Sequence, residues 1–268
     1  MSSNHHPTSE PQVFAVANQK GGVGKTTTAV NLGAALSERG ARVLCVDLDP
    51  QGHLTVNMGV AKPDDLRLTV YDVLCEHNVT AADVRLYSPG VNVDFLPANV
   101  ELAGAELQLV TEIGRESVLR EKLHPLRLEY DYMIIDCPPS LGLLSINALV
   151  AATEVIIPLQ CEYFGMKGME QLQRTIDRVR TKLNPRLRIH GILPTIHKGR
   201  TVHANEVLRD VTEHFGELVY PFQVGDSIRF AECPLAGQSI LQYARDSDGA
   251  AAYRSLAEHV MDQSQERH

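Results

Sequence analysis

The stretch NQKGGVGKTTT, residues 18–28, contains the residue types that bind phosphate groups. Its glycines let backbone N–H groups approach an anion closely, Lys25 can reach the outer phosphates of a nucleotide, and the Thr26 hydroxyl can bind Mg²⁺. The usual pattern has a glycine five residues before the Gly-Lys pair, but here Gln19 holds that place and Lys20 stands beside the glycines. An apolar run precedes the stretch and a helical pattern follows it. This order of strand, loop and helix predicts a phosphate site at a helix N-terminus, with one extra lysine.

Carboxylates follow two other apolar runs. Asp47 and Asp49 lie in VDLDPQG, and Asp136 ends the run MIIDCPP. The first two suit a metal-bound water and an attacking water, although an Asp-Pro pair is also a common start of a turn. Asp136 is typical of the carboxylate that accompanies Mg²⁺ beside a phosphate-binding loop. We interpret Cys137 as a spectator thiol, because no base accompanies it in the sequence.

Short β-branched runs alternate with longer helical stretches, which is typical of βαβ units and a parallel sheet. We expect strands at 13–18, 42–49, 91–98, 132–139, 154–160 and 187–195. We expect helices at 26–39, from the third strand to about 110, at 142–151, 165–182 and 204–215, and in the tail DGAAAYRSLAEHVMDQ. The predicted fold class is α/β, a mostly parallel twisted sheet flanked by helices. We expect a disordered N-terminal tail, 1–12, and a single domain, 13–268.

Composition narrows the class of protein. With 44% apolar and 22% charged residues the chain is typical of a soluble protein, and no apolar run reaches the ~18 residues of a membrane span. The polar N-terminus does not suit a secretory signal. The five cysteines contain no CxxC pair, which favours reduced thiols in the cytoplasm. A net charge of −8 means that any DNA contact needs a local basic patch.

Three motifs together, KGGVGKTTT, VDLDPQG and IIDCPPSLGLLSINAL, resemble the ParA/Soj chromosome- and plasmid-partitioning ATPases, P-loop proteins with a deviant Walker A loop. The similarity continues through LQCEYFGMKGMEQL and RFAECPLAGQSI and covers nearly everything after residue 12. The loop KGGVGKT alone also occurs in MinD and in the nitrogenase iron protein. The resemblance implies a slow, partner-stimulated ATPase that uses ATP/ADP and Mg²⁺. It also implies an ATP-dependent homodimer, non-specific double-stranded DNA and a ParB-type protein as partners, and a cytoplasmic, nucleoid-associated location without membrane attachment.

The resemblance also implies roles for single residues. Lys20 matches the signature lysine that reaches across a dimer interface to the partner's ATP, and Asp49 matches the residue that orients the attacking water. The implied catalytic residues are Lys20, Lys25 and Asp49, and the implied metal site comprises Thr26, Asp47 and Asp136. The implied nucleotide ligands are Lys20, Gly21, Gly22, Val23, Gly24, Lys25, Thr26, Thr27 and Asp136. The base would lie near Thr195 and residues 224–226.

DNA contacts in this family come from basic residues near the C-terminal third. Two of these positions match, Arg200 in HKGRT and Arg229 in SIRFAECP. A third is usually arginine, but Asp226 stands there, and Lys198 is a local replacement. Because each lost phosphate contact weakens binding, the resemblance implies a modest DNA affinity.

Three other functions were compared with a partitioning ATPase. A MinD-like membrane regulator needs a basic amphipathic C-terminal helix, whereas the tail MDQSQERH is short and polar. Electron transfer needs cysteines that converge at a dimer axis, and the cysteines here are not placed like that family's pair. A relative that positions another cargo remains open, as does the choice between a chromosome and a plasmid.

Overall fold

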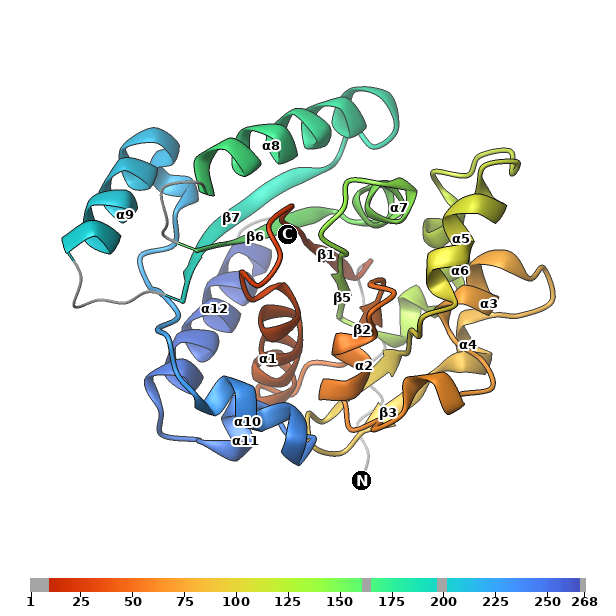
Figure 1. Cartoon of the computed structure of the whole chain (residues 1–268), viewed down its shortest axis with the longest axis horizontal. Coiled ribbons are helices and arrows are strands. Elements are labelled where there is room, and N and C mark those ends of the chain that lie inside the picture. The colour runs from red at the N-terminus through yellow and green to blue at the C-terminus, as the bar shows by residue number, and fades with distance from the viewer. Residues whose placement is uncertain (1–9, 161–164, 197–201, 266–268) are drawn as a thin grey trace.

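The computed structural model describes residues 10–160, 165–196 and 202–265 of the 268-residue chain. Its described strands form one sheet in the order β3-β4-β2-β5-β1-β6-β7 (Figure 1). Every neighbouring pair is parallel except β3 and β4. The strands are β1 (Gln12–Val16), β2 (Val43–Asp47), β3 (Leu86–Ser88), β4 (Val93–Leu96), β5 (Tyr132–Asp136), β6 (Glu154–Gln160) and β7 (Arg188–Thr195). The predicted α/β class with a mostly parallel sheet is confirmed.

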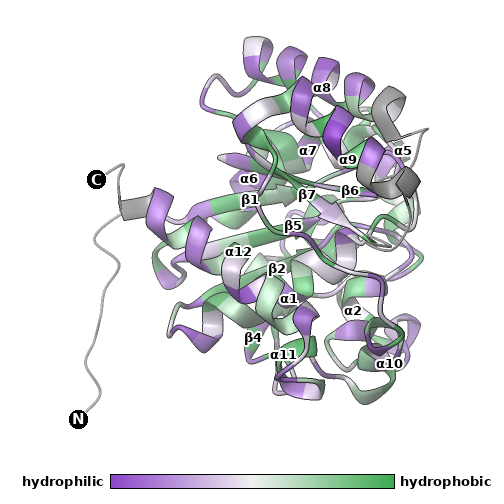
Figure 2. Cartoon of the chain, turned by 90° about the vertical axis from the view of Figure 1, so that its left-hand side faces the viewer, coloured by the Kyte–Doolittle hydropathy of each residue, from purple (hydrophilic) through white to green (hydrophobic). Residues whose placement is uncertain are grey.

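Helices cover both faces of this sheet. One face packs against α1 (Lys25–Glu38), α2 (His53–Asn57), α10 (Arg229–Ala236), α11 (Ile240–Tyr243) and α12 (Asp248–Gln265). The other packs against α3 (Val70–Cys75), α4 (Ala81–Val84), α5 (Leu102–Leu109), α6 (Val118–Leu123), α7 (Leu143–Ala151), α8 (Gly165–Lys182) and α9 (Val202–Phe215). Short 3₁₀ turns lie at Pro63–Asp65, His124–Glu129 and Gly216–Leu218. Figure 2 shows the apolar strands between helices whose outward turns are hydrophilic.

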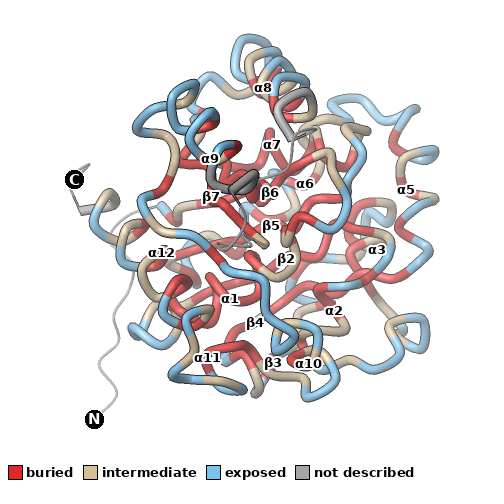
Figure 3. The backbone as a smooth tube through the Cα atoms, turned by 60° about the vertical axis from the view of Figure 1, so that its left-hand side comes forward, coloured by how far each residue is buried: buried red, intermediate tan, exposed pale blue. Residues whose placement is uncertain are grey.

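Alternating side chains divide the apolar residues between the two faces. In β1, Val13 and Ala15 belong to the core under α7, whereas Phe14 and Val16 belong to the core under α1. The central strands are buried along their whole length, as Figure 3 shows, which is why their sequences are almost continuously apolar. The register pairs Asp136 with both Val16 and Asp47, so the loops after these three strands emerge at one edge of the sheet.

Most predicted elements are present, with narrower bounds. The strand expected at 91–98 covers four residues, and β1 begins at Gln12, one residue before its expected start. Residues 1–9 of the expected N-terminal tail lie outside the described residues. The short elements β3, α2, α3, α4, α6, α10 and α11 were not predicted. Within the described ranges no helix combines the length and apolar character needed to cross a bilayer.

Candidate nucleotide-binding site

The glycine loop joins β1 to α1 at the carboxyl edge of the sheet. Gly22 and Gly24 have φ angles of 71° and 86°, in the left-handed region that favours glycine, and Gly24 caps the N-terminus of α1. No side chain caps this helix, so the N–H groups of its first turn are available to an anion. The Thr195 hydroxyl, at the end of β7, donates to the Val23 carbonyl at 2.7 Å and fixes the back of the loop.

Lys25 points into the loop that precedes it. Its side chain is buried, and Nζ donates to the Lys20 carbonyl at 3.2 Å. Burial lowers the pKa of this ammonium, while the carboxylates of Asp136 and Asp49 act in the opposite direction. A cation held in this position faces the space that the loop's N–H groups surround.

Thr26 and Asp136 form the pair that suits a divalent cation. The Thr26 hydroxyl donates to Asp136 Oδ2 at 2.7 Å. The other oxygen, Oδ1, is buried and has no hydrogen-bond partner among the described residues. Burial, followed by the nearby Asp47, raises the pKa of Asp136. A positive ion beside Oδ1 would give this oxygen a partner and would stabilise the buried negative charge of Asp136. These residues therefore fit Mg²⁺.

No described group of three or more His, Cys, Asp or Glu side chains could hold a metal on its own. Mg²⁺ commonly binds through one or two protein oxygens together with substrate phosphates. The donor set here therefore suits a metal that arrives with a nucleotide.

Asp47 and Asp49 have different surroundings although they are one residue apart. Asp47 is fully buried, and its Oδ2 accepts from the N–H and the hydroxyl of Thr55 at 2.8 and 2.7 Å. Its Oδ1 accepts from the Asp49 N–H at 3.2 Å. Burial raises the pKa of Asp47 to about 6. In this arrangement Asp47 holds the turn that presents Asp49, and its predicted role as a metal ligand stays a prediction.

A cavity of about 530 Å³ lies in front of the loop, a volume that suits a nucleotide. One end is formed by Gly21, Gly22, Gly24, Lys25, Thr26, Thr27 and Asp49. The rest of the lining comes from segments far apart in the sequence, among them Thr195, Val224, Gly225, Asp226, Phe230 and Tyr253. Thr195 and residues 224–226, which were expected near the base, thus line the same cavity as the glycine loop.

Several lining residues were missed by sequence reasoning. His53 and Asn57 come from α2, whereas Phe230 and Tyr253 come from α10 and α12. The rings of Phe230 and Tyr253 meet edge to face, with centroids 6.1 Å apart. No local pattern marks these positions, because they reach the cavity only through the packing of distant helices.

Two of the predicted residues that the structure describes, Lys20 and Arg229, do not line this cavity. Lys20 does not line it, and its Nζ donates to Gln160 Oε1 at the end of β6, at 3.0 Å. Arg229 begins α10 and is exposed. Arg200 and the neighbouring Lys198 lie outside the described residues.

A parallel sheet with a left-handed glycine loop between its first strand and first helix, facing a nucleotide-sized cavity, defines a P-loop nucleotide-binding protein. Comparison with known proteins gives the same class, since residues 11–189 match the family model described as an AAA domain. The chain is 44% identical to the chromosome partitioning protein ParA of Caulobacter vibrioides, over 96% of this chain and 96% of that protein. It is 45% identical to the sporulation initiation inhibitor protein Soj of Bacillus subtilis, over 93% and 98%. The chain therefore belongs to the ParA/Soj family.

A solved structure supports the same fold and bears a different name. It is described as cobyrinic acid a,c-diamide synthase from Mycobacterium smegmatis with bound ADP and magnesium. It is 42% identical to this chain, has a TM-score of 0.85, and the match covers 96% of this chain and 97% of that chain. ADP and magnesium are thus bound by a protein with this architecture.

Proposed function

We propose that this chain is a DNA-partitioning ATPase that switches between two states. With ATP and Mg²⁺ it forms a sandwich dimer that binds DNA without sequence preference. Slow hydrolysis, stimulated by a ParB-type protein, returns it to a monomer in the cytoplasm. Two relatives named for partitioning or sporulation control cover at least 93% of the chain, which favours this function over amide synthesis.

The residues of the cavity have matching roles in this proposal. Mg²⁺, when bound, would neutralise negative charge on the phosphates, and Thr26 and Asp136 would hold it. Lys25 and the loop N–H groups would hold the phosphates themselves. Asp49, which lines the cavity and is 8% exposed, would orient the attacking water.

The observation that carries the switch is the position of Lys20. Its ammonium is directed to Gln160 rather than to the cavity of its own chain. Lys25 already supplies a cation on the inner side of the loop. A second chain placed against this edge would receive Lys20 at its own phosphates, where a cation stabilises charge that develops during hydrolysis. Dimer formation would then depend on bound ATP.

DNA binding is supported by the exposure of Arg229 at the start of α10. Asp226, three residues earlier, is also exposed and adds a negative charge where a phosphate would approach. We therefore expect a modest affinity that falls steeply with salt.

Co-sedimentation with DNA in the presence of ADP, ATP or a slowly hydrolysed ATP analogue tests the proposal. The expected result is little DNA in the pellet with ADP, more with ATP, and most with the analogue. Equal sedimentation under all three conditions would contradict a nucleotide switch. A protein that binds the analogue but no DNA at low salt would instead act on a membrane or a protein cargo.

A further inference from the structure

The segment 49–55, which presents Asp49 to the cavity, contacts the buried residue Ala98 at two points. Ala98 follows β4 and is fully buried, and its N–H donates to the Thr55 hydroxyl at 2.8 Å. Its carbonyl lies against the middle of the same segment, because a Cβ atom added at Gly52 would meet this oxygen at 3.0 Å. Gly52 also has a φ of 62°, in the left-handed region that favours glycine. The backbone of Ala98 therefore fixes the chain from Gly52 to Thr55.

The chemistry of these groups fixes the direction of the hydrogen bonds at Thr55. A backbone N–H can only donate, so the Thr55 oxygen must accept from Ala98. The hydroxyl proton is then directed to Asp47 Oδ2, 2.7 Å away, which also accepts from the Thr55 N–H at 2.8 Å. Asp47 Oδ1 in turn accepts from the Asp49 N–H at 3.2 Å. We call this series of contacts, from Ala98 through Thr55 and Asp47 to Asp49, the Thr55 relay.

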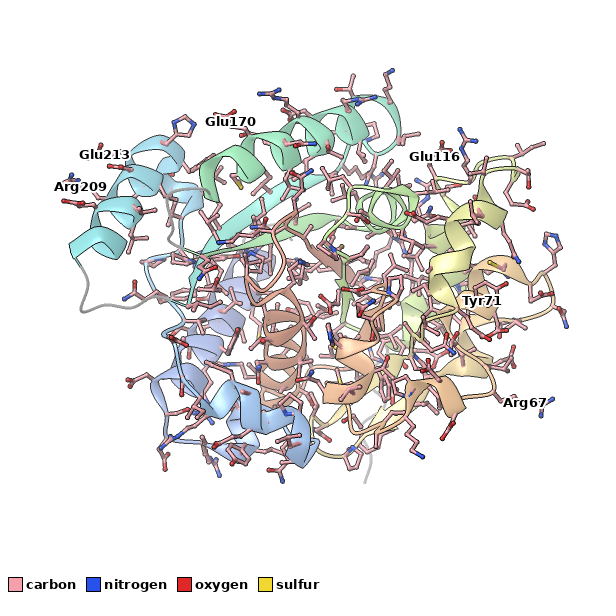
Figure 4. All side chains as sticks on the ribbon, in the orientation of Figure 1. Arg67, Tyr71, Glu116, Glu170, Arg209 and Glu213 are labelled. Carbon is pink, nitrogen blue, oxygen red and sulfur yellow. The ribbon has the colours of Figure 1, made fainter. Side chains whose placement is uncertain are left out.

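Every member of the Thr55 relay is buried. Asp47, Thr55 and Ala98 have no exposed surface, and Asp49 is 8% exposed. In contrast, the labelled side chain of Arg67, in the loop before α3, points away from the molecule in Figure 4. Buried hydrogen bonds are shielded from competition with water, and a donor or acceptor left unpaired in the interior is costly. The relay therefore holds the Asp49 backbone in one position.

We propose that Thr55 is a positioning residue for ATP hydrolysis, and this inference rests on the proposed ATPase function. Thr55 is not among the residues that line the cavity, whereas Asp49 is. The Thr55 hydroxyl instead holds Asp47, and Asp47 holds the Asp49 N–H, so that the Asp49 carboxylate is presented to the attacking water. A shift of about 1 Å in a catalytic group can slow a reaction about a hundredfold. Loss of the relay should therefore slow hydrolysis without removing any group that contacts the nucleotide.

Thr55→Val tests the relay, because valine has nearly the shape of threonine and lacks the hydroxyl. Affinity for ADP and for a slowly hydrolysed ATP analogue should stay within about twofold of the parent's, since the glycine loop, Lys25 and Thr26 are unchanged. The rate at saturating ATP, kcat, should fall by at least about tenfold, which corresponds to about 1.4 kcal/mol. Weakened nucleotide binding with an unchanged kcat would overturn the proposal.

Two further variants grade the effect. Thr55→Ser restores a hydroxyl and should recover at least about half of the parent's kcat. Thr55→Cys carries a thiol, which is a weaker donor and acceptor, so its kcat should lie between those of Thr55→Val and Thr55→Ser. It also keeps the test available if Thr55→Val does not fold. If Thr55→Ser were as slow as Thr55→Val, the shape of the side chain would matter rather than its hydroxyl, which would contradict the proposal.

The matched control is Thr153→Val, at the amino ends of β1 and β6 and away from the glycine loop. The Thr153 hydroxyl also accepts from a backbone N–H, that of Val13, at 3.0 Å, and it donates to the Val13 carbonyl at 3.0 Å. Thr153→Val should lower the midpoint of denaturant unfolding as Thr55→Val does, but its kcat should remain that of the parent. If both changes slowed hydrolysis equally, Thr55 would act only through stability, and the proposal would fail.

Hydrogen exchange tests the relay without any hydrolysis. In the nucleotide-free protein the Asp49 N–H is bound to Asp47 Oδ1, so NMR should detect slow exchange of this amide with solvent. Thr55→Val should speed this exchange by at least about tenfold, whereas Thr153→Val should leave it unchanged. Unchanged exchange in Thr55→Val would refute the relay. If the parent hydrolyses no ATP under any condition, the proposed ATPase function and the role of Thr55 in hydrolysis both fail, and the exchange result still decides whether Thr55 holds Asp49.

Discussion

Two buried polar clusters lie at opposite ends of the strands, and they differ in what surrounds them. The site cluster, at the carboxyl ends, contains Lys25, Thr26, Asp47 and Asp136. The His190 cluster, at the amino ends of β6 and β7, contains Glu154, His190, Tyr220 and His259, with the exposed Arg188 at its edge. Both place ionisable groups in the interior, where charge is costly.

The His190 cluster is enclosed by its own side chains. His190 Nδ1 is 2.5 Å from the Tyr220 hydroxyl, and its Nε2 is 3.6 Å from Glu154 Oε2. The rings of Phe14 and His259 pack against the imidazole, whose side chain is fully buried. The site cluster instead lies behind a loop with left-handed glycines and next to a cavity. Buried charge alone therefore does not mark a functional site, whereas buried charge beside an accessible cavity does.

The substitution Lys25→Ala, in the site cluster, should cause the largest loss of nucleotide affinity. This change removes the buried cation that faces the phosphates, so nucleotide affinity should fall by at least about a hundredfold, the loss of one strong charge-assisted contact. Titration calorimetry with ADP and Mg²⁺ measures it, and Lys62→Ala, at an exposed lysine, is the control. Parent-like affinity would remove the loop from the nucleotide site.

Lys20→Ala should separate binding from dimer formation. ATP affinity should remain close to that of the parent, while ATP-dependent dimer and hydrolysis should each fall by about tenfold or more, because the cation supplied in trans is lost. Light scattering with ATP measures the dimer. Gln160→Ala removes the contact of Lys20 within its own chain and should leave the dimer intact. If Gln160→Ala reproduced the defect, Lys20 would act inside one subunit.

The His190 cluster should affect stability rather than nucleotide binding. Burial, with help from His259 and Arg188, lowers the pKa of His190 from 6.5 to about 4. The unfolded chain then binds the proton more readily, so His190 contributes stability above about pH 6.5 that is lost as the pH falls towards 4. Denaturant unfolding should show a loss of about 2 kcal/mol over this range from this residue. His190→Phe should flatten the slope without changing ADP affinity, and an unchanged slope would contradict this account.

Phe230→Ala should have the smallest effect and sharpen the description of the cavity. The ring lines the cavity and is proposed to pack against the base, so its loss should weaken ADP by about fivefold through lost packing and leave pyrophosphate unaffected. Leu235→Ala, on the same helix but 90% exposed, is the matched control. Competition between ADP and pyrophosphate measures both affinities. Equal weakening of the two ligands would place Phe230 at the phosphate end.

Two parts of the cavity lining differ in how far the sequence could predict them. The part of the lining that would bind phosphate lies within seven consecutive residues, 21–27. The backbone of this loop requires glycine at specific positions, and a helical pattern follows the loop, so both features can be recognised in the local sequence. The rest of the lining combines the end of β7 and residues 224–226 with α10 and α12, and no single stretch of sequence contains it. The family resemblance indicates Thr195 and residues 224–226, whereas no local pattern in the sequence indicates Phe230 or Tyr253.

Element prediction failed for a related reason. The edge strand β3 has three residues and one exposed tyrosine, Tyr87, so it lacks the long apolar run that marked the central strands. The helix α10 contains Pro234 and buries little more than Cys233. Such elements are stabilised by their neighbours rather than by their own periodicity.

The most direct test of the switch uses Asp49→Ala in DNA co-sedimentation with ATP and Mg²⁺. A carboxylate that orients water is needed for turnover but not for holding the nucleotide, so this variant should bind ATP, stop hydrolysing and accumulate as the dimer. Because the dimer doubles the exposed arginine contacts, it should bind non-specific DNA at least as well as the parent and release it as salt rises. Adding Arg229→Ala should remove most of the DNA binding and leave the dimer intact. An Asp49→Ala protein that is dimeric with ATP yet ignores DNA at low salt would contradict the account.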